Sequence, residues 1–251
     1  MTKCISLLLS GGNGTRLGAD IPKQYICTSG YMMITRSLCA LFKCGRIESV
    51  QIVADTSWHD AIREDWEKYC AEHLRTGNND MIEVRRTGSF IREFSAPGST
   101  RQLSVLNGLE DIAKECGEDT VVLIHDAARP FVSASMLENC IKACDTHDGA
   151  MPVLPMKDTV YYSNDGTAVK KLLERDKIFA GQAPEAFLLG KYLAANRALL
   201  PERILYVKGS TEPAVMAGMD IAMIAGEESN FKVTTPADLK RYEEIVNAGD
   251  I

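Results

Sequence analysis

Short apolar runs rich in β-branched residues alternate along the chain with longer amphipathic segments. The apolar runs have strand length and the amphipathic ones have helix length, a pattern typical of strands joined by crossover helices in a mostly parallel sheet. The expected strands are 4–10, 49–54, 81–86, 121–125 and 150–154. The expected helices are 31–43, 57–74, 101–115 and 134–146. The pattern therefore predicts an α/β fold.

Residues 156–176 depart from this alternation. The sequence SNDG at 163–166 stands between two alternating runs and has the composition of a hairpin turn, so the segment is expected to form an antiparallel arm. A two-stranded ribbon is only marginally stable in water unless it packs on something else. We therefore expect this arm to mediate a symmetric homodimer.

The chain after the arm predicts a helix that starts near Pro184, a strand over 221–226 and a closing helix. The closing helix has a clear start, because Thr235 can cap it, Pro236 suits its first turn and Asp238 follows the cap by three positions. We find no repeat and no Pro/Ser-rich linker. Residues 1–251 are accordingly expected to form a single domain.

Charge and composition narrow the function classes. The 251 residues carry a formal net charge of -6, which argues against a nucleic-acid partner and requires any anion site to be a local cluster of Lys and Arg. No apolar run approaches a membrane span, and no signal segment is recognisable, so we expect a cytoplasmic protein without a membrane partner. The eight cysteines contain no CxxC pair and are expected to be reduced; with only four histidines, no protein metal site is expected.

The first expected strand ends in a glycine-rich loop. Gly11, Gly12 and Gly14 allow a sharp turn and the close approach of backbone N–H groups to a phosphate. Arg16 and Lys23 follow and can bind the same anion. The spacing fits neither the Rossmann glycine pattern nor the P-loop. A glycine cluster alone is equally compatible with an ordinary strand-to-helix turn.

A second candidate site is LIHDAARPF at 123–131. Its strand ends at His125 and Asp126, which places a carboxylate at the carboxyl edge of the sheet, where open α/β proteins bind ligands. Arg129 either pairs with Asp126 or points into the cleft toward an anionic group. His125 is expected to be a hydrogen-bonded core residue, because no orienting partner is apparent.

Five blocks together resemble a known family: GGNGTRLGADIPKQY, GSTRQLSVLNGL, HDAARPF, MKDTV and NFKVTTPADL. Over residues 5–245 their order and spacing are similar to those of the cytidylyltransferases that act on 2-C-methyl-D-erythritol 4-phosphate or D-ribitol 5-phosphate. The resemblance implies a Rossmann-like sheet of the nucleotide-diphosphosugar-transferase type with a dimerising β-arm. It also implies that CTP and a polyol phosphate react to give a CDP-alcohol and pyrophosphate, with Mg²⁺ bridging the phosphates of CTP.

The resemblance further implies a role for each matched residue. Nucleotide binding falls to Ser10, Gly11, Gly12, Asn13, Gly14, Gly98, Arg101 and Ser104. Stabilisation of charge in the transition state falls to Arg16, Lys23 and Lys232. Binding of the polyol phosphate falls to Asp126, Arg129, Thr159 and Arg175.

Departures from the family pattern concern the acceptor. Ala183 stands where relatives have a threonine that helps to hold the substrate phosphate, Ser229 replaces an acidic residue, and 211–214 read TEPA in place of an Asp-rich stretch. SGGNGTR is closer to the ribitol branch, whereas HDAARPF is closer to the methylerythritol branch. We expect ribitol 5-phosphate as the acceptor, with 2-C-methyl-D-erythritol 4-phosphate as the alternative.

Two other classes of function stay open. A nucleotide-sugar pyrophosphorylase would share the glycine loop but act on a hexose 1-phosphate. A non-catalytic nucleotide-binding module is the third reading, and the presence of Arg16, Lys23 and Asp126 together argues against it.

Overall fold

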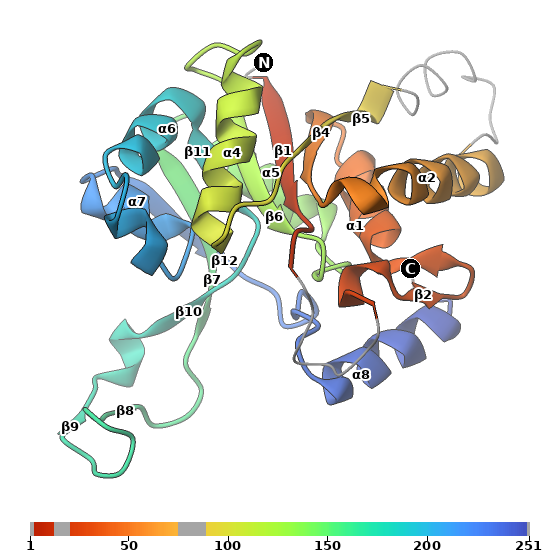
Figure 1. Ribbon diagram of the computed structural model, residues 1–251. Helices are drawn as coiled ribbons and strands as arrows, with labels where there is room; N and C mark the ends of the chain where they lie inside the picture. Colours follow the sequence, from red (N-terminus) through yellow and green to blue (C-terminus); the bar gives the residue numbers. More distant parts are fainter. Residues whose placement is uncertain (1–2, 13–20, 75–88, 250–251) are drawn as a thin grey trace.

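A central sheet with helices on both faces forms the body of the protein, and an arm extends from one end of it (Figure 1). The computed structural model describes residues 3–12, 21–74 and 89–249. The strands follow the order β10-β7-β11-β6-β1-β4-β5, and β12 pairs with β7. Their bounds are β1 Cys4–Leu9, β4 Ile47–Val53, β5 Ile91–Ser95, β6 Val121–Asp126, β7 Gly149–Pro155, β10 Phe179–Gly181, β11 Glu185–Leu188 and β12 Ile221–Ala225.

The sheet is mainly parallel, as predicted. Strand β1 pairs in parallel with β4 and β6, and β4 pairs in parallel with β5. Strand β11 runs antiparallel to both β6 and β7, and β10 runs antiparallel to β7. The parallel strands β1 and β6 lie at the centre, where both of their faces are covered, which explains their largely apolar sequences.

Two helical layers enclose the sheet. The helices are α1 Met33–Lys43, α2 His59–His73, α4 Arg101–Ala113, α5 Ala134–Ala143, α6 Leu189–Arg197, α7 Thr211–Met216 and α8 Pro236–Asn247. On one face, Leu8 of β1 belongs to a core cluster with residues of α1, α2 and α5. On the other face, Leu7 belongs to a cluster with residues of α4, α6 and α7. Neighbouring residues of one buried strand thus contribute to opposite layers.

Helix α8 begins as the sequence predicts. Thr235 caps it by accepting from the backbone N–H of Asp238, and the Asp238 carboxylate accepts from the Thr235 backbone in return. This capping box satisfies two backbone donors that a helix start leaves without partners. The helix then packs Tyr242 against Met33 and Val233, which attaches it beside α1.

The predicted helix start near Pro184 is wrong. Glu185–Leu188 form β11, and α6 begins only at Leu189. The run Ala186–Leu188 is apolar, and its backbone pairs with β6 and β7 at once, so tertiary pairing overrides the helical reading of the proline. Strand β5 was not predicted, and the predicted strand 81–86 lies outside the described residues.

The arm is antiparallel, as predicted. Strand β8, Tyr161–Tyr162, pairs with β9, Lys171–Leu172, and the turn between them is held by Asp165, which accepts from the Thr167 backbone N–H at 2.9 Å. Figure 1 shows the arm extending from the body below β10. Four large apolar side chains on it are more than half exposed: Tyr161, Tyr162, Val169 and Leu172.

Two sequence expectations concern the whole chain. All eight cysteines lie within the described ranges and are free thiols. In those ranges, no helix combines the length and the apolar character that crossing a membrane requires.

Candidate functional site

The glycine loop leaves β1 at the carboxyl edge of the sheet and is held by two side chains. Gln24 Nε2 donates to the carbonyl oxygens of Ser10 and Gly12 at 2.6 and 2.8 Å. The Tyr25 hydroxyl accepts from Ser10 Oγ at 2.9 Å and donates to Ser10 O at 3.0 Å. These bonds attach the start of the loop to the 3-10 turn Lys23–Tyr25, so the backbone of Lys23 lies close to Ser10–Gly12. The expected residues Asn13, Gly14 and Arg16 lie outside the described residues.

A second loop, between β5 and α4, packs tightly against the first. A Cβ on Gly11 would stand 2.8 Å from Pro97 Cβ, and a Cβ on Gly98 would stand 2.4 Å from Leu103 Cβ, so neither position has room for a side chain. Ser104 Oγ accepts from the Gly98 N–H at 2.9 Å and donates to Thr100 O at 3.0 Å. The Ser104 hydroxyl therefore holds this loop in shape.

Asp126 lies at the end of β6 inside a ring of cations. Its Oδ2 accepts from Lys232 Nζ at 2.8 Å, its Oδ1 accepts from Arg101 Nη2 at 3.1 Å, and Arg129 Nε lies 3.8 Å from Oδ2. Leu9 of β1 is the register partner of Asp126, so this cluster adjoins the glycine loop that begins at Ser10. The structure thus joins Arg101, Lys232 and the Asp126–Arg129 turn, which belong to three separate sequence blocks.

Electrostatics favour the ionised form of this carboxylate. Burial by itself would raise the pKa of Asp126, but Arg101 and Lys232 outweigh it and hold the pKa far below the usual range. Arg129 is also fixed by donating from Nη1 to the backbone oxygen of Asn230 at 2.6 Å. Of the two expectations for Arg129, pairing beside Asp126 is the one observed.

His125 has the core role predicted for it. It is fully buried, and its Nε2 lies 3.0 Å from the backbone oxygen of Arg129. Burial lowers the pKa of His125 to about 4, so the ring is neutral near pH 7. A neutral, enclosed imidazole beside Asp126 serves to position the 125–129 turn.

The sequence reasoning assigned no site role to Ser210, Thr211 and Glu185. Ser210 Oγ accepts from Arg101 Nη1 at 2.5 Å, and Glu185 Oε1 accepts from Thr211 Oγ1 at 2.8 Å. Glu185 is almost fully enclosed, and burial raises its pKa. Gln24, Tyr25 and Asn230 stood inside the quoted blocks PKQY and NFKV, which was the signal that pointed to them.

Thr159 and Arg175 do not join this cluster within one chain. Both lie exposed on the arm, and Arg175 Nη1 donates to the backbone oxygen of Lys157 at 3.1 Å. Ala183, the departure from the family threonine, is buried, and its carbonyl accepts from Asn230 Nδ2 at 2.8 Å. It therefore lies directly behind the segment that carries Lys232.

Within the described residues, no group of three or more His, Cys, Asp or Glu side chains is arranged to hold a metal ion. The carboxylate of Asp126, at the end of β6, already accepts hydrogen bonds from Arg101 and Lys232. Any ion here would depend on ligand atoms brought by a substrate.

Comparisons with known proteins identify the family of the chain. A family model described as IspD, 2-C-methyl-D-erythritol 4-phosphate cytidylyltransferase, matches residues 4–248. The enzyme of that name from Geobacter metallireducens is 31% identical over 245 residues, covering 96% of this chain and 96% of that protein. The one from Nitrosomonas eutropha is 31% identical over 252 residues, covering 98% of this chain and 97% of that protein. A bifunctional IspD/IspF enzyme from Paramagnetospirillum magneticum is 31% identical over 241 residues, and the chain spans only 56% of its length.

Solved structures share the fold. The 4-diphosphocytidyl-2C-methyl-D-erythritol synthase from Anaerococcus prevotii has a TM-score of 0.76 at 23% identity, covering 98% of this chain and 96% of that one. The Francisella tularensis 2-C-methyl-D-erythritol 4-phosphate cytidylyltransferase has a TM-score of 0.73 at 22% identity, covering 97% and 99%. The chain belongs to the IspD family of 2-C-methyl-D-erythritol 4-phosphate cytidylyltransferases, a family of nucleotidyltransferases.

Proposed function

We propose that the protein transfers the cytidylyl group of CTP to 2-C-methyl-D-erythritol 4-phosphate. The observation that carries the proposal is the ring of Arg101, Arg129 and Lys232 around Asp126, next to the glycine loop. The sequence preference for ribitol 5-phosphate has no support in the comparisons, because the family description and the full-length relatives named above all specify the methylerythritol phosphate. The alternative of the sequence analysis is therefore the better supported acceptor.

The reaction is an in-line displacement at the α-phosphorus of CTP. A phosphate oxygen of the acceptor forms the new P–O bond, and the bond from the α-phosphorus to the bridging oxygen breaks, so that pyrophosphate leaves with the electron pair. The nucleophile is already an anion, so no general base is required. His125 is enclosed and neutral near pH 7, and it has no role in the proton balance. The rate depends on positioning and on neutralising crowded negative charge.

The cations have distinct places in this scheme. Lys23, attached to the glycine loop, binds the triphosphate, and Lys232 stabilises the charge that develops at the α-phosphate. Arg129 and Asp126 orient the acceptor from the end of β6. An incoming phosphate competes with Asp126 for Lys232 and Arg101, so binding exchanges one set of ion pairs for another.

Among the residues that the structure describes, magnesium fits only through the substrate. Mg²⁺ commonly keeps several waters and binds to substrate phosphates with one or two carboxylates. Here the triphosphate would supply most of its ligands, and Asp126 is the neighbouring carboxylate. When bound, the ion would neutralise charge on the triphosphate.

The arm supports assembly into a homodimer. Tyr161, Tyr162 and Leu172 are 57%, 52% and 59% exposed on a two-stranded ribbon, an arrangement that requires a covering partner in water. Thr159 and Arg175, which lie on the same arm between the ribbon and the body, would then reach the acceptor site of the second subunit.

The decisive experiment compares two acceptors. With CTP, 2-C-methyl-D-erythritol 4-phosphate should exceed ribitol 5-phosphate by about tenfold or more in kcat/KM, a difference of about 1.4 kcal/mol. A preference for ribitol 5-phosphate would overturn the acceptor assignment. Turnover of a hexose 1-phosphate with another nucleoside triphosphate would instead identify a nucleotide-sugar pyrophosphorylase.

A second measurement tests the glycine loop. Lys23→Ala should lower kcat by a factor on the order of 10² to 10³, as expected when one preorganised charge is removed. Lys191→Ala, which removes a surface lysine paired with Asp148, is the matched control and should retain activity. Near-normal turnover of Lys23→Ala would contradict the assignment of this loop.

A further inference from the structure

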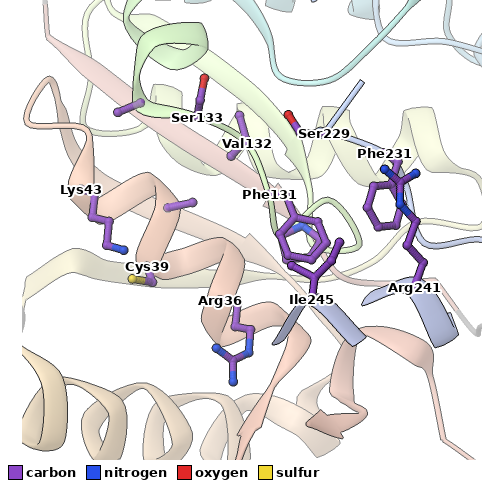
Figure 2. A pocket seen from close by; sticks show the side chains of 13 residues that line it. Arg36, Cys39, Lys43, Phe131, Val132, Ser133, Ser229, Phe231, Arg241 and Ile245 are labelled. Atoms are coloured by element: carbon purple, nitrogen blue, oxygen red, sulfur yellow. The ribbon is translucent and has the colours of Figure 1, made fainter. Parts of the chain in front are cut away.

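A cavity of about 490 Å³ lies between α1, α8 and the segment that follows Arg129, and the proposed reaction does not use it. Its size falls in the range of small-molecule pockets, about 300 to 1,000 Å³. Figure 2 shows Arg36, Cys39 and Lys43 along α1 on one side, and Phe131, Phe231, Arg241 and Ile245 on the other. Apolar walls and cationic groups thus face the same space.

The charged side chains that line the cavity are all cationic. Arg36, Lys43 and Arg241 line it, and no acidic side chain is among the described lining residues, although the whole chain carries a formal charge of -6. Arg36 is only 9% exposed; its Nη2 donates to the Thr28 backbone oxygen at 3.0 Å, and its Nε has no hydrogen-bond partner among the residues that the structure describes. Glu228, the acid whose field reaches Arg241, is itself paired with Lys157. An anion would therefore find uncompensated positive charge here.

The apolar part of the lining suits an aromatic or short aliphatic group. The rings of Phe131 and Phe231 lie 5.2 Å apart, and the Arg241 guanidinium stands 4.1 Å from the centre of the Phe231 ring. Val132 and Ile245 extend this surface. A ligand with an apolar body and an acidic head would satisfy both parts of the lining.

Two short segments connect the cavity to the cationic ring around Asp126. Phe131 follows Arg129 by two positions, and Phe231 directly precedes Lys232. The segments are bonded to each other, because Arg129 Nη1 donates to Asn230 O at 2.6 Å and the Val233 N–H donates to Ala128 O at 2.9 Å. A ligand that shifts either segment would therefore shift a site cation as well.

We propose that this cavity binds a small amphiphilic anion, an apolar body that carries a sulfonate, carboxylate or phosphate, and that its occupation changes turnover at the Asp126 site. The binding part is independent of the proposed function, and the effect on turnover rests on it. A failure of binding and a failure of catalysis can therefore be measured separately.

The binding test uses 1-anilinonaphthalene-8-sulfonate as the probe, followed by its fluorescence and by calorimetry. The wild-type protein should bind it saturably, and CTP should not displace it. Lys43→Glu and Arg241→Glu should each raise the Kd by about tenfold or more. Lys142→Glu, the same charge change on an exposed residue of α5 that does not line the cavity, should leave the Kd within about twofold.

Two further comparisons separate this cavity from unspecific apolar binding. N-phenyl-1-naphthylamine, which lacks the sulfonate, should bind about tenfold more weakly, and Ala134→Phe, which places a ring in the lining, should abolish probe binding while the protein stays folded by circular dichroism. Equal loss of probe binding in Lys142→Glu, displacement of the probe by CTP, or no saturable binding would overturn the site.

The effect on turnover is tested separately. A probe concentration that saturates the wild type should change its kcat/KM at least about threefold and should not change that of Arg241→Glu. Probe binding without this change would overturn the coupling.

Discussion

Replacing Asp126 with Asn tests the central ring of charges directly. Asn keeps the shape of the side chain but removes the charge, which leaves Lys232 and the two arginines without the carboxylate that pairs with them directly, and Glu185 as the remaining acid near Arg101 and Arg129. Removing one member of a buried ion pair costs about 3–5 kcal/mol. The Asp126 side chain is only 10% exposed, but those of Arg101 and Lys232 are 34% and 32% exposed, so the lower end applies. We expect a loss of about 3 kcal/mol in the free energy of unfolding.

The assay is urea unfolding of the ligand-free protein, followed by far-UV circular dichroism and tryptophan fluorescence. In thermal unfolding of a chain of this length, the same loss of about 3 kcal/mol corresponds to a fall in Tm of about 6–12 °C. Asp176→Asn is the matched control, because Asp176 pairs with Arg175 at the surface with 93% of its side chain exposed. That variant should lose less than about 1 kcal/mol.

The same variant gives a pH signature with a defined sign. Because the pKa of Asp126 is lowered by folding, its stabilisation is present above the unfolded pKa of about 3.9 and is lost as the pH falls further. The difference in stability between wild type and Asp126→Asn should be constant near pH 7 and begin to shrink below about pH 4.5. A loss under about 1 kcal/mol at pH 7, or a difference that does not depend on pH down to about pH 3, would refute the reasoning.

Three further outcomes are expected. Gly98→Ala should lower the free energy of unfolding by about 1–3 kcal/mol, because the new methyl group would lie 2.4 Å from a neighbouring Cβ, whereas Gly117→Ala, with nothing within 4 Å, should change it by less than about 1 kcal/mol in the same urea assay. Burial lowers the pKa of His125 to about 4, so between about pH 6.5 and pH 4 the unfolded chain binds a proton at this residue that the folded chain does not bind. The free energy of unfolding of the wild type should therefore fall by about 3 kcal/mol over this range. His125→Gln should lack this part of the pH dependence, and an unchanged slope would contradict the assignment. Leu172→Asp should convert a dimer to a monomer in sedimentation at micromolar concentration, and a wild-type protein that is already monomeric would exclude the arm as an interface.

The sequence alone determined the features that depend on neighbours along the chain. The apolar runs predicted β1, β4, β6 and β7 to within a few residues, because strands buried between helical layers are predominantly apolar. The capping residues of α8 and the turn of the arm were also predictable, since side chains within three positions of each other make those hydrogen bonds. The quoted block HDAARPF then identified Asp126 and Arg129 together, and NFKVTTPADL identified Lys232 separately.

Tertiary structure alone decided how these pieces act together. Asp126 and Lys232 are 106 positions apart, and no local pattern indicates that their side chains meet at 2.8 Å. Glu185–Leu188 are a strand because β6 and β7 offer hydrogen bonds on both sides, which a short apolar run after a proline does not reveal. The cavity between α1 and α8 likewise has no sequence motif, because its two walls come from opposite ends of the chain. Local sequence specifies elements, whereas charge neutralisation and cavity shape depend on distances between elements that only the folded chain establishes.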